Sequence, residues 1–339
     1  MEVRNVLHLP VQEGSQVGDA RRQVARWTEM LGFDATCSGK VAIIVTEAAG
    51  NLAKHTTSGG ELLVRALARG DVPGIEVLSL DRGPGIGDVS RALTDGYSTA
   101  GSPGTGLGAI YRLADEFAIH SMRPLGTAVL ARLWSRKPPP LAPGSLEVGV
   151  LHLPMPGEEA CGDSWAIDLR PGRNMITVVD GLGHGPDAAE AARLAIRAFQ
   201  AHAAQPPTRI IERMHDAMRS SRGAAVAIAE VDLEAGIIRY AGVGNIGAAV
   251  VSGSETKNLV SHSGTVGHQL HKLQEFVYPW PAGALLVMHS DGITQRWDLD
   301  RYPGLASRDP ALVAGVLYRD FTRGRDDTTM VVVRRALAT

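Results

Sequence analysis

Residues 81–117 read DRGPGIGDVSRALTDGYSTAGSPGTGLGAIYRLADEF, and two glycine loops within them decide the fold expected for the first part of the chain. The first loop, residues 81–87, follows an apolar run that predicts a strand. Its glycines let the backbone approach a ligand, and Asp81 can accept a hydrogen bond from an exocyclic amine. The second loop, residues 101–108, opens a predicted helix whose free amide groups suit phosphate. Either loop alone is also compatible with an ordinary turn.

A predicted helix over residues 38–55 adds two polar side chains. Glu47 and Asn51 are four residues apart, so they share one face of this helix. A carboxylate above a carboxamide can orient a hydroxyl group and bind Mg²⁺, although such pairs also occur on many solvated helices. The second glycine loop lacks the Lys-Ser/Thr ending of a P-loop, and no strand immediately precedes it, which disfavours a Rossmann site.

Together, EAAGN, DRGPGIG and GTGLG fall in an order and spacing that resembles the N, G1 and G2 boxes of the GHKL ATP-binding fold. Residues 81–117 are similar, more narrowly, to the small anti-sigma serine/threonine kinases of bacteria, of the RsbT type. The resemblance covers roughly residues 1–134 and implies a GHKL (Bergerat) α/β sandwich. The elements predicted from periodicity make the same mixed α/β layer: helices over 17–31, 38–55 and 104–116, and strands over 62–68, 75–80 and 128–134.

This resemblance implies roles for individual residues. Glu47 would be the general base that helps a partner's Ser or Thr attack ATP, and Asn51 would hold Mg²⁺. Asp81, helped by Thr127, would recognise the adenine amine. The other implied contacts to the base and phosphates come from Gly83, Gly85, Gly104, Thr105, Gly106, Leu107 and Gly108. Phosphoryl transfer needs mainly positioning and charge neutralisation, so a small domain without a covalent nucleophile suffices.

The segment SRKPPPLAPGS, residues 135–145, marks the predicted domain boundary. Proline has no amide donor and a fixed φ, so this run is expected to be a semi-rigid spacer. Residues 1–134 and 146–339 are therefore expected to be separate domains. After the spacer, short strand candidates dominate, and two helices over 186–203 and 209–220 interrupt them. Short strands joined by tight turns favour antiparallel sheets covered by helices, so the whole chain is assigned to the α+β class.

Aspartates recur in the second domain where apolar strands are predicted to stop. They are Asp163 in GDSW, Asp180 in TVVDGLGHG, Asp291 in HSDGIT, and the pair Asp326 and Asp327 in GRDDTT. A single Asp at a strand end is usually part of a turn. Four such clusters suggest convergence, and converging carboxylates repel one another unless cations hold them. Hard oxygen ligands favour Mg²⁺ or Mn²⁺ over zinc.

These motifs, with GVGNIG, are similar to the metal-dependent protein phosphatases of the SpoIIE/PPM type, particularly the RsbX type, over about residues 145–335. The resemblance implies an α-β-β-α sandwich that holds two Mn²⁺ or Mg²⁺ ions. Asp180 would bridge the two metals with help from the Gly181 carbonyl, and Asp163 would support one of them. Asp291 and Asp326 would bind the other, with Asp326 favoured over Asp327 although their order stays open. A water activated by the metals would attack phosphoserine or phosphothreonine.

Several other residues have plain structural alternatives. His55 is expected to be structural or on the surface, and Glu158 to belong to a solvated surface pair. His184 is expected to stabilise its turn rather than to act as an acid. Arg222 could meet phosphate, but arginine is also common on surfaces. For Cys161, packing as a small residue is expected rather than a catalytic role.

Composition excludes other classes of protein. The chain has 34 Lys and Arg against 36 Asp and Glu, a formal charge of −2, so no nucleic-acid partner is expected. No apolar stretch approaches the about 18 residues of a membrane segment. The two cysteines form neither a disulfide framework nor a zinc-type spacing, which favours a cytoplasmic location.

The sequence thus predicts a fusion of two opposed activities. The family resemblance implies that the partner is a STAS-domain antagonist protein of a bacterial stress or sigma-factor switch, in phosphorylated and unphosphorylated forms, with other sigma-pathway regulators as further candidates. One alternative is a phosphatase whose first domain is a nucleotide-gated docking module without kinase activity. Another is a phosphatase of broad specificity whose first domain only improves solubility.

Overall fold

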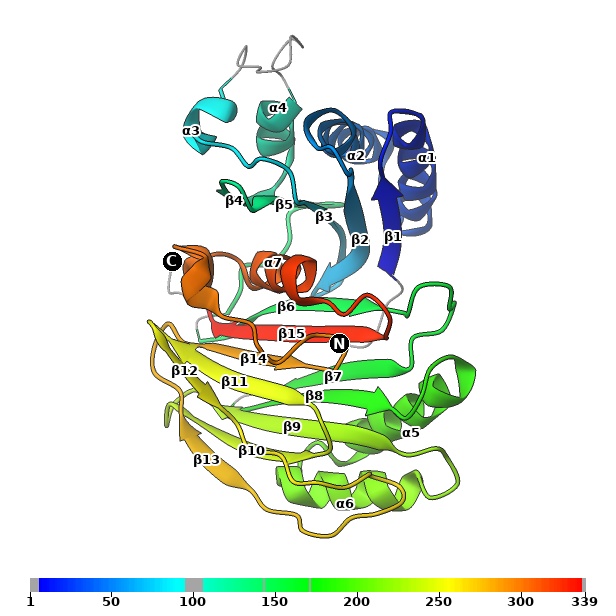
Figure 1. Ribbon diagram of the computed structural model, residues 1–339, viewed down its shortest axis with the longest axis vertical. Helices are drawn as coiled ribbons and strands as arrows, with labels where there is room; N and C mark the ends of the chain where they lie inside the picture. Colours follow the sequence, from blue (N-terminus) through cyan, green and yellow to red (C-terminus); the bar gives the residue numbers. More distant parts are fainter. Residues whose placement is uncertain (1–5, 95–105, 143, 171, 337–339) are drawn as a thin grey trace. The chain divides into compact units, whose positions relative to one another are not determined.

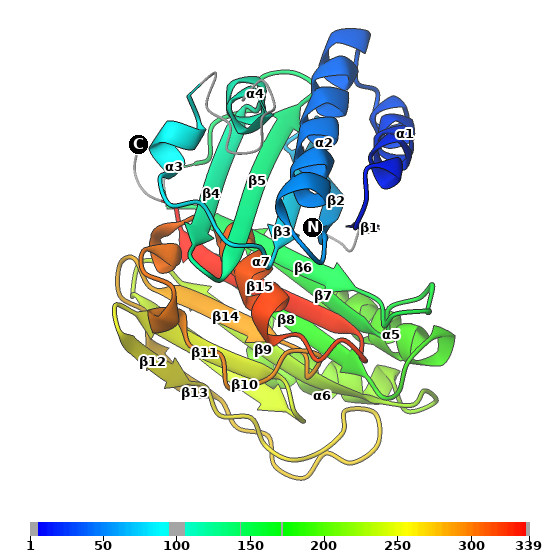
Figure 2. The ribbon, with the colours of Figure 1, turned by 45° about the horizontal axis from the view of Figure 1, so that its top comes forward.

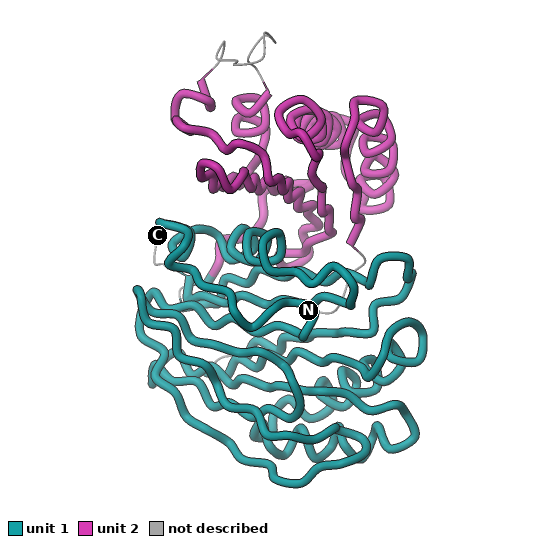
Figure 3. The backbone as a smooth tube through the Cα atoms, viewed as in Figure 1, with its two compact units in different colours: residues 1–3, 142–339 teal, residues 4–141 magenta. Residues whose placement is uncertain are grey.

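The computed structural model describes residues 6–94, 106–142, 144–170 and 172–336. Contacts between Cα atoms divide the chain between Leu141 and Ala142 into an N-terminal unit, magenta in Figure 3, and a C-terminal unit, teal. This division falls inside the proline-rich segment 135–145. In the described ranges no helix is long and apolar enough to cross a membrane.

The N-terminal unit is an antiparallel sheet with helices on one face (Figures 1 and 2). Its strand order is β1-β2-β3-β5-β4. Alternate side chains of β2, β3 and β5 pack against α1, α2 and α4, as expected for a sheet with one covered face. The strands are β1 (Val6–Val11), β2 (Gly60–Arg69), β3 (Val72–Asp81), β4 (Glu116–Met122) and β5 (Gly126–Trp134). The helices are α1 (Ser15–Met30), α2 (Ala35–His55), α3 (Val89–Ala92) and α4 (Gly106–Leu113).

Helix α2 is the longest helix described in this unit, and its sequence explains both of its ends. Asp34 caps the first turn by accepting a hydrogen bond of 2.6 Å from the Cys37 amide. Lys54 and His55 lie in the last turn, where positive charge is favourable. Thr56 then leaves the helical conformation. The helix begins three residues before the predicted position 38, because the side chain of Asp34 accepts a hydrogen bond from one of its first free amide groups.

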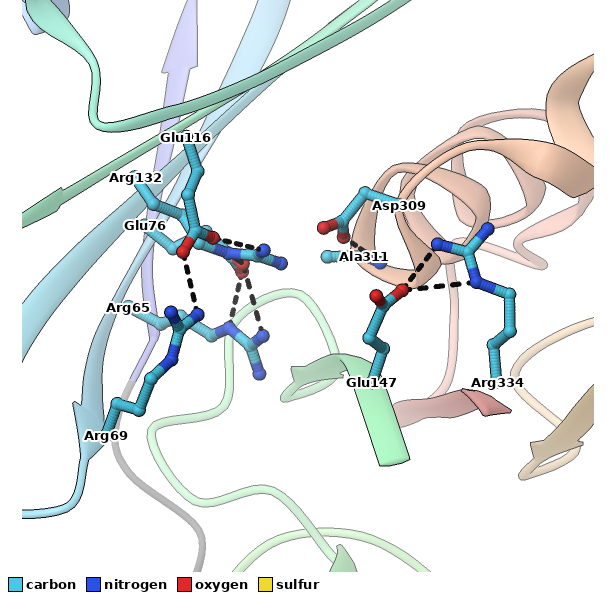
Figure 4. Close-up of polar contacts among 9 residues, drawn as sticks. All are labelled: Arg65, Arg69, Glu76, Glu116, Arg132, Glu147, Asp309, Ala311 and Arg334. Atoms are coloured by element: carbon cyan, nitrogen blue, oxygen red, sulfur yellow. Dashed lines mark hydrogen bonds and ion pairs between the residues drawn. The ribbon is translucent and has the colours of Figure 1, made fainter. Parts of the chain in front are cut away.

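A ladder of charged side chains crosses the other face of this sheet (Figure 4). Strand pairing places Arg65 opposite Glu76, Glu76 opposite Arg132, and Arg132 opposite Glu116. Arg65 and Arg132 bond to the two Glu76 oxygens at 2.5 and 2.7 Å. Burial by itself would raise the pKa of Glu76, but the two arginines outweigh it and lower that pKa to about 2. This ladder was not predicted from the sequence.

The C-terminal unit consists of two antiparallel sheets between layers of helices (Figure 1). The strand orders are β13-β10-β9-β8-β7 and β12-β11-β14-β15-β6. The first sheet contains β7 (Asp163–Arg170), β8 (Arg173–Gly181), β9 (Ala224–Asp232), β10 (Ile237–Val243) and β13 (Phe276–Pro279). The second contains β6 (Leu146–Leu153), β11 (Gly247–Ser252), β12 (Glu255–Asn258), β14 (Leu285–His289) and β15 (Thr328–Arg335). The helices are α5 (Pro186–His202), α6 (Pro207–Ala217) and α7 (Pro310–Phe321).

Two hydrophobic cores hold these layers together. One lies between the two sheets and includes Val178 and Tyr240 from one sheet and Leu286 and Val331 from the other. The second packs α5 and α6 on the outer face of the first sheet. Helix α7 covers the second sheet so closely that a Cβ added to Gly149 of β6 would lie 2.1 Å from the helix backbone. The architecture is therefore the predicted α-β-β-α sandwich, and the mixed α/β class of the first domain is also confirmed.

Candidate functional sites

The N-terminal unit contains a cavity of about 250 Å³ at the end of the sheet that carries the first glycine loop. Its wall combines the C-terminal half of α2, the loop that follows β3, the start of α4 and part of β5. Six residues with a predicted nucleotide role line it: Asn51, Asp81, Gly85, Gly106, Leu107 and Thr127. Segments far apart along the chain thus meet around one concave site.

At one part of the wall, backbone amides orient the Asp81 carboxylate. Its Oδ1 accepts hydrogen bonds from the amides of Gly83 at 2.7 Å and Thr127 at 3.2 Å. Gly126 has φ of 95°, and a Cβ there would lie 2.1 Å from the Asp81 carbonyl oxygen. Glycine is required at 126 because both its conformation and this close approach exclude a side chain. The carboxylate is consequently held in a fixed position beside Thr127, as recognition of an amine demands.

At another part of the wall, the polar face of α2 meets the start of α4. A Cβ added to Gly106 would lie 3.0 Å from Glu47 Oε2 and 3.2 Å from Asn51 Oδ1. Glu47 lies beside this glycine without lining the cavity itself. Gly108 is buried within α4 and does not line the cavity either, whereas Gly104 and Thr105 lie outside the described residues.

Two polar residues of the wall, His55 and Arg123, were not predicted to belong to a nucleotide site. His55 lies in the wall, although the sequence was interpreted as placing it in a structural or surface role. Its position one turn after Asn51 on α2 was the available signal. Arg123 also lines the cavity, and its guanidinium lies so close to Gly87 that a Cβ on that glycine would be 2.8 Å from its central carbon. No local motif indicated Arg123, because it comes from the turn between β4 and β5.

In the C-terminal unit, the predicted aspartates lie at strand ends of both sheets. Asp163 begins β7 and pairs across the strands with Asp180 near the end of β8. Asp291 lies two residues after β14, while Asp326 and Asp327 immediately precede β15. The two sheets of the sandwich therefore bring these carboxylates together, although up to 164 positions separate them along the chain (163 to 327).

The carboxylates strongly perturb one another. Burial raises the pKa of Asp180 to about 7, and the charges of Asp291, Asp326 and Asp327 add to the effect. Burial and the charge of Asp180 raise the pKa of Asp163 well above its usual value. Burial and Asp291 likewise raise the pKa of Asp326. The cluster therefore disfavours its own ionisation, and a bound cation would relieve this cost.

Two carboxylate oxygens indicate whether the cluster fits a divalent cation, because their surroundings lack other partners. The Oδ2 atoms of Asp163 and Asp327 are buried without a hydrogen-bond partner. Such orphan oxygens are costly unless a cation or a donor meets them. In the described part of the chain, no group of three or more acidic, histidine or cysteine side chains is arranged so that it could hold a metal ion by itself. The donor set of hard oxygens nevertheless fits Mg²⁺ or Mn²⁺, which keep water among their ligands.

Asp326 and Asp327 lie differently within the cluster. Asp326 is partly exposed beside Asp291, whereas Asp327 is buried and its charge acts on Asp163. The Oδ1 atom of Asp327 accepts a hydrogen bond of 2.8 Å from the Met155 amide. Both aspartates of the pair therefore belong to the cluster: Asp326 lies toward Asp291, and Asp327 acts on Asp163.

Neighbouring polar residues support or surround the cluster. The Asn245 amide, within the GVGNIG motif, donates a 2.8 Å hydrogen bond to Asp291, a contact that was not predicted. His184 pairs with Glu158 at 2.7 Å, and their side chains are 57% and 27% exposed. Arg222 pairs with an aspartate of α5 rather than with the cluster. The amide of Gly181 donates to the Gly162 carbonyl at 3.1 Å, which joins the strand ends that carry Asp163 and Asp180.

Comparison with known protein families assigns each unit separately. The model of the histidine kinase-like ATPase domain matches residues 11–133. The model of stage II sporulation protein E (SpoIIE) matches residues 170–336.

Individual relatives match the same two parts. Serine/threonine-protein kinase RsbT of Bacillus subtilis (strain 168) is 32% identical over 118 residues, 34% of this chain and 88% of that protein. Phosphoserine phosphatase RsbX of the same organism is 28% identical over 145 residues, 42% of this chain and 73% of that protein. A solved chain from the bacterial stressosome, a modular system adapted to control secondary messenger signaling, is 30% identical. It has a TM-score of 0.53 and covers 56% of this chain and 100% of its own length.

Proposed function

The chain belongs to the histidine kinase-like ATPase family of the RsbT type in its first part and to the SpoIIE phosphatases in its second, and from this we propose a bifunctional regulator of a bacterial partner switch. It phosphorylates and dephosphorylates serine or threonine on a STAS-domain antagonist protein. The similarity to a kinase and a phosphoserine phosphatase on one chain supports this proposal. Linking the two modules raises their effective concentration around one bound partner.

The phosphatase half of the proposal rests on one observation. Carboxylates from the strand ends of two sheets lie together, and two of them have a buried oxygen without a hydrogen-bond partner. In the proposal, Asp163, Asp180, the Gly181 carbonyl, Asp291 and Asp326 would hold the divalent cations. Bound Mn²⁺ or Mg²⁺ would supply positive charge for the phosphate and increase the acidity of water. Asn245 fixes the orientation of Asp291, and Asp327 lines the buried side of the site.

The phosphatase assignment is tested with a phosphoserine peptide or a phosphorylated STAS protein in the presence of Mn²⁺. Wild-type protein should release phosphate, and Asp180→Asn should reduce the rate at least about 100-fold, because a shared ligand is lost. Asp168→Asn is the matched control, since Asp168 lies on β7 but pairs with Arg170 at 2.6 Å. Equal rates in wild type and Asp180→Asn would remove the phosphatase from the proposal.

The kinase half rests on the cavity that Asp81, Thr127, Asn51 and Gly106 line. In the proposal, Asp81 recognises the adenine amine, while Asn51 holds Mg²⁺ near the phosphates. Glu47 accepts the proton of the partner's hydroxyl group as that oxygen attacks the γ-phosphate. The placement of Glu47 and Asn51 beside the same glycine supports this division of roles.

A second candidate function is a nucleotide-gated docking module without kinase activity. It is favoured by the position of Glu47, which lies outside the cavity lining, so nucleotide could bind without it. Radiolabelled ATP with purified STAS proteins separates the two functions. Label transfer that is lost in Glu47→Ala supports the kinase, whereas nucleotide-dependent binding of the partner without transfer supports docking.

A further inference from the structure

The turn between β4 and β5 packs closely on the first glycine loop of the N-terminal unit. The Ile86 amide donates a 2.7 Å hydrogen bond to the Ser121 hydroxyl group near the end of β4. Gly85 has φ of 71°, and a Cβ there would lie 2.6 Å from the Met122 carbonyl oxygen. Arg123 is the next residue, so these contacts fix the point at which its side chain leaves the turn.

The Arg123 guanidinium lies flat against Gly87 of the same loop. A Cβ built on Gly87 would lie 2.8 Å from the guanidinium carbon Cζ, 3.0 Å from Nη2 and 3.1 Å from Nη1. Because the central carbon is nearest and the two nitrogens are almost equally distant, the glycine faces the plane of the guanidinium and not its edge. The backbone of Gly87 is not in the left-handed region, so what its missing side chain provides is space for Arg123.

The guanidinium of Arg123 is available to a ligand. Arg123 and Gly87 both line the cavity of about 250 Å³, and Arg123 is the only arginine or lysine among the described residues that do so. The described part of the chain gives its guanidinium neither a hydrogen bond nor an ion pair. Asp88, the acid next to Gly87, instead caps α3 by accepting a 2.9 Å hydrogen bond from the Arg91 amide. The flat cationic group of Arg123 can therefore meet a molecule in the cavity.

The position of Arg123 indicates which end of a nucleotide it would meet. Arg123 begins the turn that leads to Thr127 in β5, and the Thr127 amide donates to the Asp81 carboxylate at 3.2 Å. Asp81 is the residue to which the proposed function assigns the adenine amine. The same proposal assigns the phosphates to the start of α4, where Asn51 lies beside Gly106. Arg123 therefore extends from the hairpin end that carries the base contacts.

Resting on the proposed nucleotide site, we propose that Arg123 is a further nucleotide-binding residue, which stacks the plane of its guanidinium on the purine base. A guanidinium stacks on aromatic faces through its plane and its charge, and every purine presents such a face. Asp81 then recognises the edge of the base, while Arg123 contacts its face. Such a contact depends on the base and is independent of the number of phosphates.

Calorimetry on the full-length chain measures this contact with ATP and with adenosine, the latter by its displacement of ATP. Arg123→Met keeps the unbranched stem and removes the charged plane, and it should raise both Kd values by the same factor, about 5- to 10-fold. Arg123→Lys keeps the charge without the plane, so it should recover little of either affinity. Arg26→Met is the matched control, because Arg26 is an exposed arginine of α1 that does not line the cavity.

Gly87→Ala tests the same contact from the other side. The new methyl group would meet the guanidinium and displace it, so this variant should weaken ATP binding by a similar factor. When Gly87→Ala is combined with Arg123→Met, the methyl group has no guanidinium to displace. The Kd of the double variant should therefore equal that of Arg123→Met alone.

Four results would overturn the inference. They are an unchanged Kd in Arg123→Met, a loss for ATP without a loss for adenosine, full recovery by Arg123→Lys, and additive losses in the double variant. The second and third would make Arg123 a phosphate contact. Should Arg123→Met fail to fold, Arg123→Lys and Gly87→Ala still decide the case through the two Kd values. A wild type that binds no ATP would instead refute the proposed nucleotide site itself.

Discussion

Replacing Asp180 should stabilise the protein when metal is absent and abolish the stabilisation that metal provides. The raised pKa of Asp180 means that the folded state disfavours its ionised form. The rise of this pKa from 3.8 to about 7 corresponds to a loss of ~4 kcal/mol in the free energy of unfolding, at about 1.4 kcal/mol for each pKa unit. Asp180→Asn removes this charge while it keeps nearly the same shape.

The sign of the effect depends on pH. Because the folded state binds the proton more tightly than the unfolded state, the free energy of unfolding should fall as pH rises from about 4 to about 7. Without metal, the variant should therefore exceed wild type by up to ~4 kcal/mol at pH 8 and by little at pH 4. Mn²⁺ at about 100 times its Kd should add about 2.7 kcal/mol to wild type only.

Urea unfolding followed by tryptophan fluorescence, with chelator or with Mn²⁺, measures these differences. The transition that Mn²⁺ shifts in wild type belongs to the C-terminal unit. Asp168→Asn serves as the control, because its carboxylate pairs with Arg170 away from the cluster. The reasoning would be refuted if metal-free Asp180→Asn were less stable than wild type at pH 8, or if their difference did not change with pH.

Three further predictions concern the scaffold and the nucleotide cavity. Gly149→Ala should destabilise the C-terminal unit by about 1–3 kcal/mol in chemical unfolding, because the new methyl group would lie 2.1 Å from the backbone of α7; no loss would contradict the close packing. Glu76→Gln should lower the free energy of unfolding by about 3 kcal/mol at neutral pH. This loss of stability should disappear as the pH falls from 4.5 toward 2, where the wild-type carboxyl group becomes protonated. A loss of stability that does not change with pH would count against the charged ladder. Gly126→Ala should weaken ATP binding, measured by calorimetry, at least about 10-fold, because the new methyl group forces Asp81 to move. Gly14→Ala is the control and should have no effect, because a Cβ at position 14 has no atom within 4 Å. Equal ATP affinities of wild type and Gly126→Ala would exclude a role for the turn at Asp81.

The local sequence was sufficient to predict the fold where a short motif requires a particular backbone conformation or side-chain type. Glycine loops and aspartates at strand ends predicted both fold families, and the fold and the family assignments are confirmed. Glycines report backbone conformations that other residues avoid, so they mark turns such as the one at Gly126 directly. Alternating apolar residues in the same way predicted most strands.

Other elements had no such local signal, among them α7, β1 and β4. Helix α7 is buried almost all round, so its residues show no apolar stripe, and the sequence did not predict it. Strand β1 contains Pro10, and a proline in the sequence normally indicates that a segment is not a strand. Strand β1, however, lies at the edge of the sheet, where proline is tolerated. Strand β4 begins at Glu116, which the sequence assigned to the end of a helix.

The amino-acid sequence alone indicated which side chains are candidates to carry chemistry: the carboxylates, the glycines and the polar pair on α2. Tertiary structure decided which of them touch. His152 and Thr329 are 177 residues apart, and only the pairing of β6 with β15 brings them within 2.9 Å. The charged ladder from Arg65 to Glu116 likewise depends on the register of four strands. The reason is physical: backbone preference is a property of neighbouring residues, whereas electrostatic coupling depends on distances that the packed sheets set.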